Sequence, residues 1–288
     1  MDSTINEIYH EIFKYLDVRF LKTTVSLVNV KLSVFIKHQI KLTTINLRNF
    51  NRIDDNNLPL LVDLIGLDIG TNVTITDRAI NNLTNLKGLK LGMNKSITDQ
   101  GINNLVNLTS LSIGINKNIT DQGVKNLTNL KRLYLERGEK ITDQGISHLT
   151  KLSGLYLGWN ENITDQSINN LINLKSLSLW NNECITDQCI GNLTNLTFLN
   201  LGWNRKISDQ GVKNLINLRR LNLGHNIIIT DLAVRKLVNL TSVSLGDNRI
   251  ITDQGISNLI NLIDLSLGKN KNITNQAIRN STNLVSLD

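Results

Sequence analysis

The hydrophobic positions of the chain repeat with a period of 22 residues. The isoleucine of an Ile-Thr-Asp-like triplet recurs at this spacing eleven times, at positions 53, 75, 97, 119, 141, 163, 185, 207, 229, 251 and 273. Between triplets the chain reads, with small variations, Gln-Gly-Ile-x-Asn-Leu-x-Asn-Leu-x-x-Leu-x-Leu-Gly-x-Asn. A fixed period of this length is typical of solenoids, in which each repeat forms one coil that packs on its neighbours.

Each repeat contains the pattern of one short strand and one short helical turn. In the segment x-Leu-x-Leu-x the leucines alternate with variable residues, so the leucines point to one side of a strand and the variable residues to the other. Thr or Asp of the triplet suits a helix N-cap. Ile102, Leu105 and Leu108, at a spacing of three, suit a short helix or 3₁₀ turn. The pattern predicts an α/β solenoid over residues 42–288, with a parallel sheet on its concave face and short helices outside.

Asparagine and glycine recur after most of the predicted strands. A buried asparagine there has both a donor and an acceptor, so we expect it to bond backbone groups of its own coil and of the neighbouring coil. The glycines are expected to let coils approach closely or to take an unusual backbone angle. The asparagines are Asn72, Asn94, Asn116, Asn160, Asn182, Asn204, Asn226, Asn248 and Asn270, and the glycines are Gly70, Gly92, Gly114, Gly158, Gly202, Gly224, Gly246 and Gly268.

The core segment Leu-x-x-Leu-x-Leu-x-x-Asn, for example Leu86, Leu89, Leu91 and Asn94, is identified as a leucine-rich repeat. The resemblance covers about eleven repeats from residue 42 to the end and implies a horseshoe-shaped, protein-binding solenoid. The Ile-Thr-Asp triplet resembles the cysteine-containing subclass, with Asn in place of the usual Cys. The 22-residue length and the Asn-Leu-Thr-Asn-Leu phrase resemble the bacterial internalin type equally well, so both subclasses stay open.

Residues 1–41 lack the repeat, and their apolar residues have helical spacing. One interpretation is a helical cap that shields the first strand of the solenoid from water. The other is an F-box, because the order Ile-Asn-Glu-Ile, Ile-Phe-Lys-Tyr-Leu and Val-Ser-Leu-Val resembles that pattern, with an asparagine in place of its proline and a leucine in place of its tryptophan. The resemblance implies docking on the adaptor of a cullin–RING (SCF) ubiquitin ligase through Ile8, Ile12, Leu16 and Val28.

These two interpretations lead to two functions. With an F-box, the chain is expected to be a substrate-recognition subunit that presents a target protein to the SCF ligase. With a cap, it is a stand-alone binding module, such as an inhibitor or a host-interaction effector.

Composition supports many small cores and an intracellular setting. The chain has 43 asparagines, one proline and twelve aromatic residues among 288, too few bulky side chains for one large core. The N-terminus lacks a basic segment followed by an apolar run, and no stretch approaches the roughly 18 apolar residues of a membrane span. Two cysteines fit a reducing compartment. We therefore expect a cytoplasmic protein, with the nucleus or a host cytoplasm as alternatives.

Half of the aromatic residues gather at variable positions around the predicted strands of four consecutive repeats. Exposed Trp, Tyr and Arg dominate binding hot spots, and a contiguous apolar patch on a soluble surface usually has a partner. The sequence therefore predicts a partner site on the concave face. Its predicted residues are Tyr134, Tyr156, Trp159, Trp180, Phe198 and Trp203, together with the charged residues Arg132, Glu136, Arg137 and Arg220.

Charge and reactive residues narrow the kind of function. The formal net charge is +7, which invites a nucleic-acid interpretation, but the concave bias is mild and an acidic protein partner explains it equally. The four histidines are scattered and no nucleophile stands at a recognisable spacing. Cys184 and Cys189 lack a second pair of metal ligands, and Cys189 is expected to serve packing. We expect no catalytic residue, no metal site and no cofactor.

Overall fold

The computed structural model contains two compact units. Unit 1 ends at Leu130, and unit 2 runs from Lys131 to Asp288. The residues that the structure describes are 44–47, 53–56, 58–61, 63–137 and 140–288. The predicted F-box or cap, with its candidate adaptor residues Ile8, Ile12, Leu16 and Val28, lies outside these residues.

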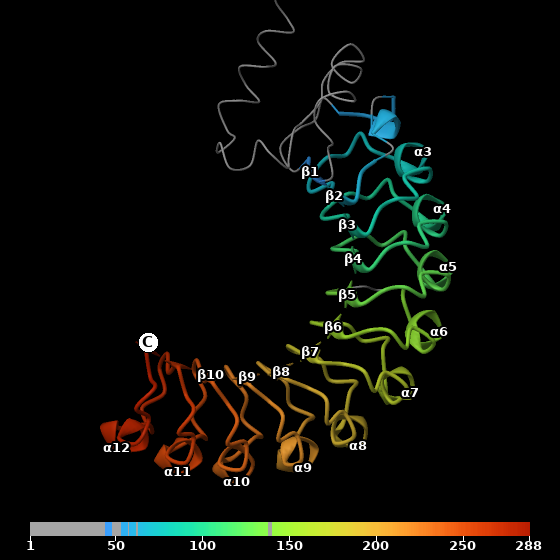
Figure 1. Cartoon of the computed structure of the whole chain (residues 1–288). Helices are drawn as coiled ribbons and strands as arrows, with labels where there is room; N and C mark the ends of the chain where they lie inside the picture. Colours follow the sequence, from blue (N-terminus) through green and yellow to red (C-terminus); the bar gives the residue numbers. More distant parts are fainter. Residues whose placement is uncertain (1–43, 48–52, 57, 62, 138–139) are drawn as a thin grey trace, which may run out of the picture. The chain divides into compact units, whose positions relative to one another are not determined.

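Both units contain a parallel sheet of very short strands, coloured blue to red along the chain in Figure 1. The strands of unit 1 are β1 (Thr44–Asn46), β2 (Gly66–Asp68), β3 (Gly88–Lys90) and β4 (Ser110–Ser112). Those of unit 2 are β5 (Arg132–Tyr134), β6 (Gly154–Tyr156), β7 (Ser176–Ser178), β8 (Phe198–Asn200), β9 (Arg220–Asn222), β10 (Ser242–Ser244), β11 (Asp264–Ser266) and β12 (Ser286–Leu287). Within each unit every strand pairs with the next at an offset of 22 residues, as Leu67 does with Leu89. The predicted parallel sheet is confirmed.

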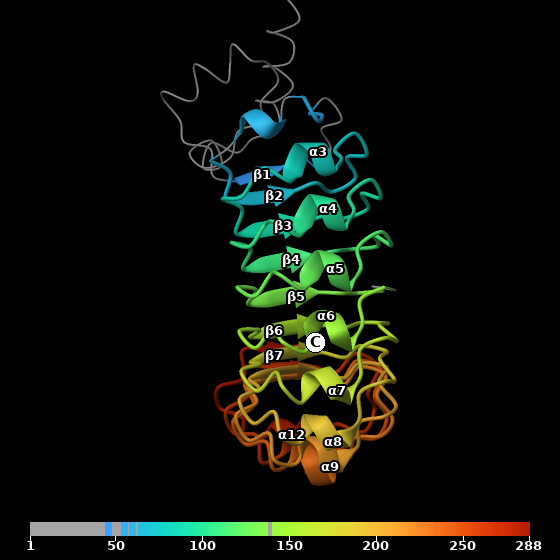
Figure 2. The same cartoon turned by 90° about the vertical axis from the view of Figure 1, so that its right-hand side faces the viewer.

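Each coil carries one helical turn on the side away from its strand (Figures 1 and 2). In unit 1 these are η1 (Leu58–Leu60), α3 (Asp77–Ile80), α4 (Asp99–Ile102) and α5 (Asp121–Val124). In unit 2 they are α6 (Asp143–Ile146), α7 (Asp165–Ile168), α8 (Asp187–Ile190), α9 (Asp209–Val212), α10 (Asp231–Val234), α11 (Asp253–Ile256) and α12 (Asn275–Ile278). None of the helices in the described part of the chain is long and apolar enough to cross a membrane.

The helix start follows the predicted capping chemistry. Thr98 has extended backbone, and its hydroxyl accepts a hydrogen bond from the N–H of Gln100 at 3.3 Å. The carboxylate of Asp77, one coil earlier, accepts from both the N–H and the hydroxyl of Thr98, at 2.7 and 2.5 Å. The helix is shorter than the spacing of three suggests. It ends at Ile102, because a 22-residue coil must turn back at once towards its next strand, and the buried Leu105 lies in that turn.

The core is aliphatic, and the buried asparagine of the turn is bonded as predicted. Asn226 is fully buried, and its side-chain amide donates to the carbonyls of Asn204 at 2.9 Å and Leu201 at 3.1 Å. Its side-chain oxygen accepts from the N–H groups of Ile228 and Ile229, at 3.0 and 2.9 Å. One side chain therefore shapes its own turn and joins two coils, which we call the asparagine ladder.

The turn after the strand has two forms. In the first, the glycine has a positive φ, and the next residue donates back to the preceding coil, as the Met93 N–H does to the Gly70 carbonyl at 2.8 Å. In the second, which we call the shifted turn, the residue after the glycine position has the positive φ and donates forward. The Trp203 N–H, for example, bonds the Gly224 carbonyl of the next coil at 2.9 Å. The residues with positive φ in shifted turns are Arg137, Trp159, Asn181, Trp203 and His225, and a forward bond is made by the first four.

The two forms of the turn differ in whether the glycine takes the unusual backbone angle that the sequence suggested. A positive φ is confirmed at Gly70, Gly92, Gly114, Gly246 and Gly268, and a Cβ at Gly92 would lie 2.3 Å from the Gly70 carbonyl oxygen. Gly158, Gly202 and Gly224 do not take the unusual backbone angle, and at Gly202 the other expected role holds, because a Cβ there would lie 2.8 Å from Trp180 Cδ1 of the preceding coil. After all three glycines the next residue has the left-handed conformation instead, and after Gly158 and Gly202 its N–H bonds a carbonyl of the following coil.

Candidate protein-binding site

Three of the predicted aromatic residues lie on strands of unit 2. Tyr134 on β5 and Tyr156 on β6 occupy equivalent positions, and their rings stack with centroids 4.2 Å apart and planes 8° apart. Neighbouring strands lie about 4.8 Å apart, so equivalent rings meet face to face. Phe198 begins β8, and the Arg220 guanidinium lies 5.2 Å from its ring centroid. These three rings are half-buried.

The three tryptophans lie in the turn after the strand rather than on the strand itself. Trp159 and Trp203 hold the positive-φ position of shifted turns and are 38% and 39% exposed. Trp180 holds the preceding, glycine position in its coil, and its ring lies 4.4 Å from that of Trp159 at an angle of 51°. The Arg137 guanidinium lies over the Trp159 ring, 4.0 Å from its centroid. Trp180 also reaches over Gly202, where a Cβ would lie 2.8 Å from its Cδ1.

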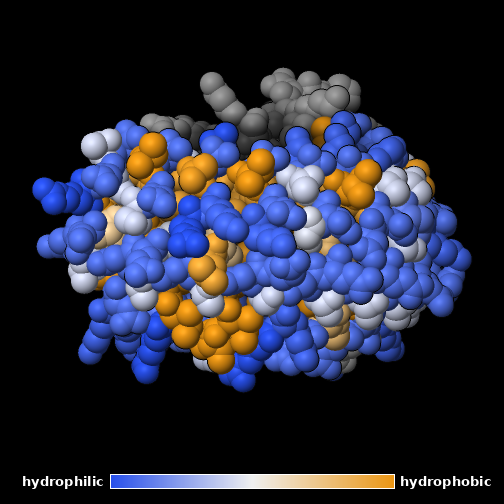
Figure 3. All heavy atoms as spheres, turned by 90° about the horizontal axis from the view of Figure 1, so that it is seen from below, coloured by the Kyte–Doolittle hydropathy of each residue, from blue (hydrophilic) through white to orange (hydrophobic). Residues whose placement is uncertain are grey.

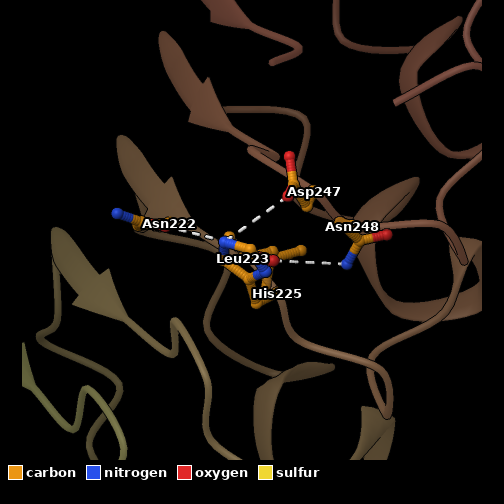
Figure 4. A network of polar contacts seen from close by, with 6 residues as sticks. Asn222, Leu223, His225, Asp247 and Asn248 are labelled. Carbon is orange, nitrogen blue, oxygen red and sulfur yellow. Dashed lines mark hydrogen bonds and ion pairs between the residues drawn. The ribbon is translucent and has the colours of Figure 1, made fainter. Parts of the chain in front are cut away.

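Two further residues extend this line. The His225 ring stacks on Trp203 at 4.1 Å, and its Nε2 lies 3.9 Å from an Asp247 carboxylate oxygen. Figure 4 shows His225 turned towards Asp247, beside the Asn248 amide that bonds the Leu223 carbonyl at 3.3 Å. The predicted site residues omit both. The signal was present in the sequence, because His225 and Asp247 stand 22 and 44 residues after Trp203.

The site thus consists of two parallel rows, together called the aromatic site. The strand row is Tyr134, Tyr156, Phe198 and Arg220, and the turn row is Arg137, Trp159, Trp180, Trp203, His225 and Asp247. Arg132 and Glu136 are exposed on either side of Tyr134 in its coil. Burial, followed by the neighbouring Tyr156, raises the pKa of Tyr134, whereas the charge of Arg132 lowers it. The phenol therefore stays neutral at physiological pH.

Outside the aromatic site, Cys189 is a reactive side chain whose surroundings differ greatly from those in water. Cys189 is fully buried in α8, and burial raises the pKa of its thiol far above the ordinary value. The predicted packing role is confirmed. Across the residues that the structure describes, no group of three or more His, Cys, Asp or Glu side chains could hold a metal ion.

Comparison with known proteins agrees with this architecture. A family model described as Leucine Rich repeat matches residues 192–216 and 236–260. The solved structure of an internalin from Listeria monocytogenes is 26% identical with a TM-score of 0.62, covering 100% of this chain and 95% of that chain. The fold is a leucine-rich-repeat solenoid. A search of curated proteins gives no match.

Two other structures share the leucine-rich-repeat fold. The yeast Rad7 and Elc1 complex matches with 21% identity and a TM-score of 0.66, over 85% of this chain and 74% of that chain. A leucine-rich-repeat protein of Leptospira interrogans matches with 24% identity and a TM-score of 0.64, over 96% and 81%.

Proposed function

We propose that this solenoid is a protein-binding scaffold whose partner is held by the aromatic site of unit 2. The observation that carries the proposal is the contrast between an aliphatic core and six aromatic side chains gathered on the surface of four consecutive coils. Stacked rings are held in place by their neighbours, so binding costs little side-chain entropy. Tryptophan and arginine are the residue types that contribute most to protein interfaces.

Backbone strain supports the same site. A left-handed backbone costs a residue with a side chain on the order of 1–2 kcal/mol, and Arg137, Trp159, Trp203 and His225 all adopt it. Such strain gathers at functional sites, where it fixes the direction of a side chain. In the turn row it fixes the direction of bulky and charged side chains at the position that follows the glycine position.

The charges of the site favour a protein with acidic and apolar groups over a nucleic acid. Arg137 and Arg220 contact rings, which leaves their edges able to meet carboxylates. Asp247 in the turn row and Glu136 beside Tyr134 would repel a phosphate backbone. A rigid row of rings and cations suits binding, and we propose that the chain has no catalytic activity.

Within this role, we propose that the chain is the substrate-recognition subunit of an SCF ubiquitin ligase. The support is the F-box-like pattern of residues 1–41, which precedes leucine-rich repeats in the order found in that family. If those residues serve only as a cap, the same aromatic site makes the chain a stand-alone inhibitor or effector.

The first experiment tests the aromatic site. Replacing Trp159, Trp180 and Trp203 together by Ala should abolish binding of the proteins that the wild-type chain captures from its source cells, while circular dichroism stays unchanged. These are the only three tryptophans in the chain, so intrinsic fluorescence reports on the aromatic site alone and should shift when a captured partner is titrated in. As a control, Val73, Met93 and Val106, exposed apolar residues of unit 1, are replaced together by Ala and should leave binding intact. Wild-type affinity in the tryptophan variant would refute the site.

The second experiment tests the adaptor. Purified SCF adaptor subunit is captured on wild-type chain, on a chain lacking residues 1–41, and on a chain carrying Ile12→Glu and Leu16→Glu. Capture that is lost in both variants, with the aromatic site still binding its partner, supports the substrate receptor. Absence of capture by the wild type removes the ubiquitin role and leaves the stand-alone module.

A further inference from the structure

A second apolar surface lies on unit 2, away from the aromatic site. Ile216, Val238 and Ile260 occupy the same position in three consecutive coils, between the helix and the following strand. Their exposed fractions are 56%, 46% and 57%. Figure 3, which views the helix side, shows apolar side chains in a row along one edge of this face. We call these three residues the isoleucine–valine row.

The fold does not need apolar residues at these positions. The equivalent residue is an exposed threonine in five other coils, namely Thr84, Thr128, Thr150, Thr194 and Thr282. Those coils have the same strand, turn and helix as the coils of the row. Three large apolar side chains in water therefore contribute little to folding, and an exposed apolar group of this kind indicates a contact surface.

Positive charge flanks two of the three row residues, whereas the stretch 257–264 around Ile260 contains Asp264 and neither Lys nor Arg. Lys213 and Arg219 stand on the two sides of Ile216, and Arg235 and Lys236 precede Val238. The stretches 213–220 and 235–242 contain neither Asp nor Glu. A partner that matches this surface therefore has both acidic and apolar side chains.

The spacing of the row points to a helix. The strands that follow the row residues lie about 4.8 Å apart, and one turn of an α-helix rises about 5.4 Å. A helix lying along the row would meet Ile216, Val238 and Ile260 with one side chain per turn, at i, i+3 or i+4, and i+7. The accumulated mismatch over the row is only about 1 Å.

A polar border makes the row narrow. Asn217, Asn239 and Asn261 follow the three row residues, and each side-chain amide donates to a carbonyl of the preceding coil, at 2.9, 2.8 and 3.0 Å. A row one residue wide, bordered by fixed amides, fits a single helix and offers too little apolar area for a lipid surface. We propose that the isoleucine–valine row docks an amphipathic helix with acidic residues beside its apolar stripe.

The test uses a synthetic helical peptide of about five turns, fluorescently labelled, with one leucine per turn and glutamates on both sides of the leucines. Its fluorescence anisotropy is followed on adding wild-type chain at low salt. Replacing all three row residues by Thr should weaken binding at least about tenfold, because it removes the apolar side chains. The variant should still fold, since threonine holds this position in five other coils. Ile172→Thr is the matched control, since Ile172 is 59% exposed in the same position but separated from the row by Thr194. It should leave affinity within about twofold.

Two further samples decide the kind of partner. A peptide with lysines in place of the glutamates should bind at least about tenfold more weakly than the acidic one. In a co-sedimentation assay with vesicles of phosphatidylcholine and phosphatidylserine, the wild-type chain and the threonine variant should sediment to the same extent. Equal binding of both peptides, an unaffected threonine variant, or vesicle binding that the threonine variant abolishes would each overturn the proposal. The tryptophan experiment on the aromatic site is independent of all these outcomes.

Discussion

Trp159 and Trp203 occupy a backbone conformation that is normally left to glycine, and each has a glycine immediately before it. The sequence predicted which aromatic residues reach the surface, because the 22-residue period fixes their position in the coil. It could not predict the shifted turn. The same Gly-x-Asn phrase accompanies both forms of the turn, and the choice depends on whether a peptide N–H points to the preceding or the following coil.

The shifted turn predicts that glycine, compared with alanine, stabilises the chain at position 159 but destabilises it at position 180. Trp159→Gly should be more stable than Trp159→Ala by about 1 kcal/mol, because alanine keeps the left-handed strain and glycine removes it. Trp180 has no positive φ, so Trp180→Gly should be less stable than Trp180→Ala by about 0.5–1 kcal/mol. Urea unfolding of the four variants gives both differences. The same sign at both positions would contradict the shifted turn.

Among the elements, strands and caps followed directly from the sequence, while helix length did not. Leucine alternation and the threonine of the triplet are local signals, and both placed their element correctly. Ile102, Leu105 and Leu108 are all buried as their spacing implies, yet only the first is helical. A spacing of three reports which residues face the core and does not distinguish a helix from a series of tight turns.

The asparagine ladder predicts that replacing a ladder asparagine by alanine destabilises the fold much more than replacing an exposed asparagine of the same coil. Asn226→Ala should destabilise unit 2 by about 3 kcal/mol, because it leaves buried carbonyl and N–H groups of two coils without their bonds. Asn217→Ala, which removes one exposed bond to the Thr194 carbonyl, should cost less than about 1 kcal/mol. Thermal unfolding compares the two, and equal losses would show that the ladder is not the main support of the turn.

On the scale of the whole molecule, the period of 22 was sufficient to predict the fold class. The boundary between residues 1–41 and the repeats stays a prediction, as do the adaptor contacts of Ile8, Ile12, Leu16 and Val28. The reason is physical. A helical apolar pattern is the same whether the helix packs on its own solenoid or on another protein, so the sequence cannot distinguish a cap from a docking module.

The net charge of +7 predicts weak, non-specific attraction to polyanions. Labelled single-stranded oligonucleotides should bind at low salt and lose about tenfold or more in affinity between roughly 50 and 200 mM salt, with little dependence on base sequence. Fluorescence anisotropy over a salt series measures this. Salt-resistant, sequence-dependent affinity would instead identify the chain as a nucleic-acid reader and displace the protein-binding proposal.

The asparagine ladder also determines how such a chain can change by recombination. Each rung joins equivalent residues one period apart, as the Asn226 side-chain amide does with the Asn204 backbone carbonyl, so deleting or duplicating one whole 22-residue copy recreates the same bonds across the new junction. A gain or loss of any other length breaks them. Deleting or duplicating a whole copy would change the position of the aromatic site in the solenoid, or insert a coil between Trp159 and Trp180. The fold would stay intact. A change in the number of repeats can therefore alter the binding surface while the hydrogen bonds of the ladder asparagine keep the fold.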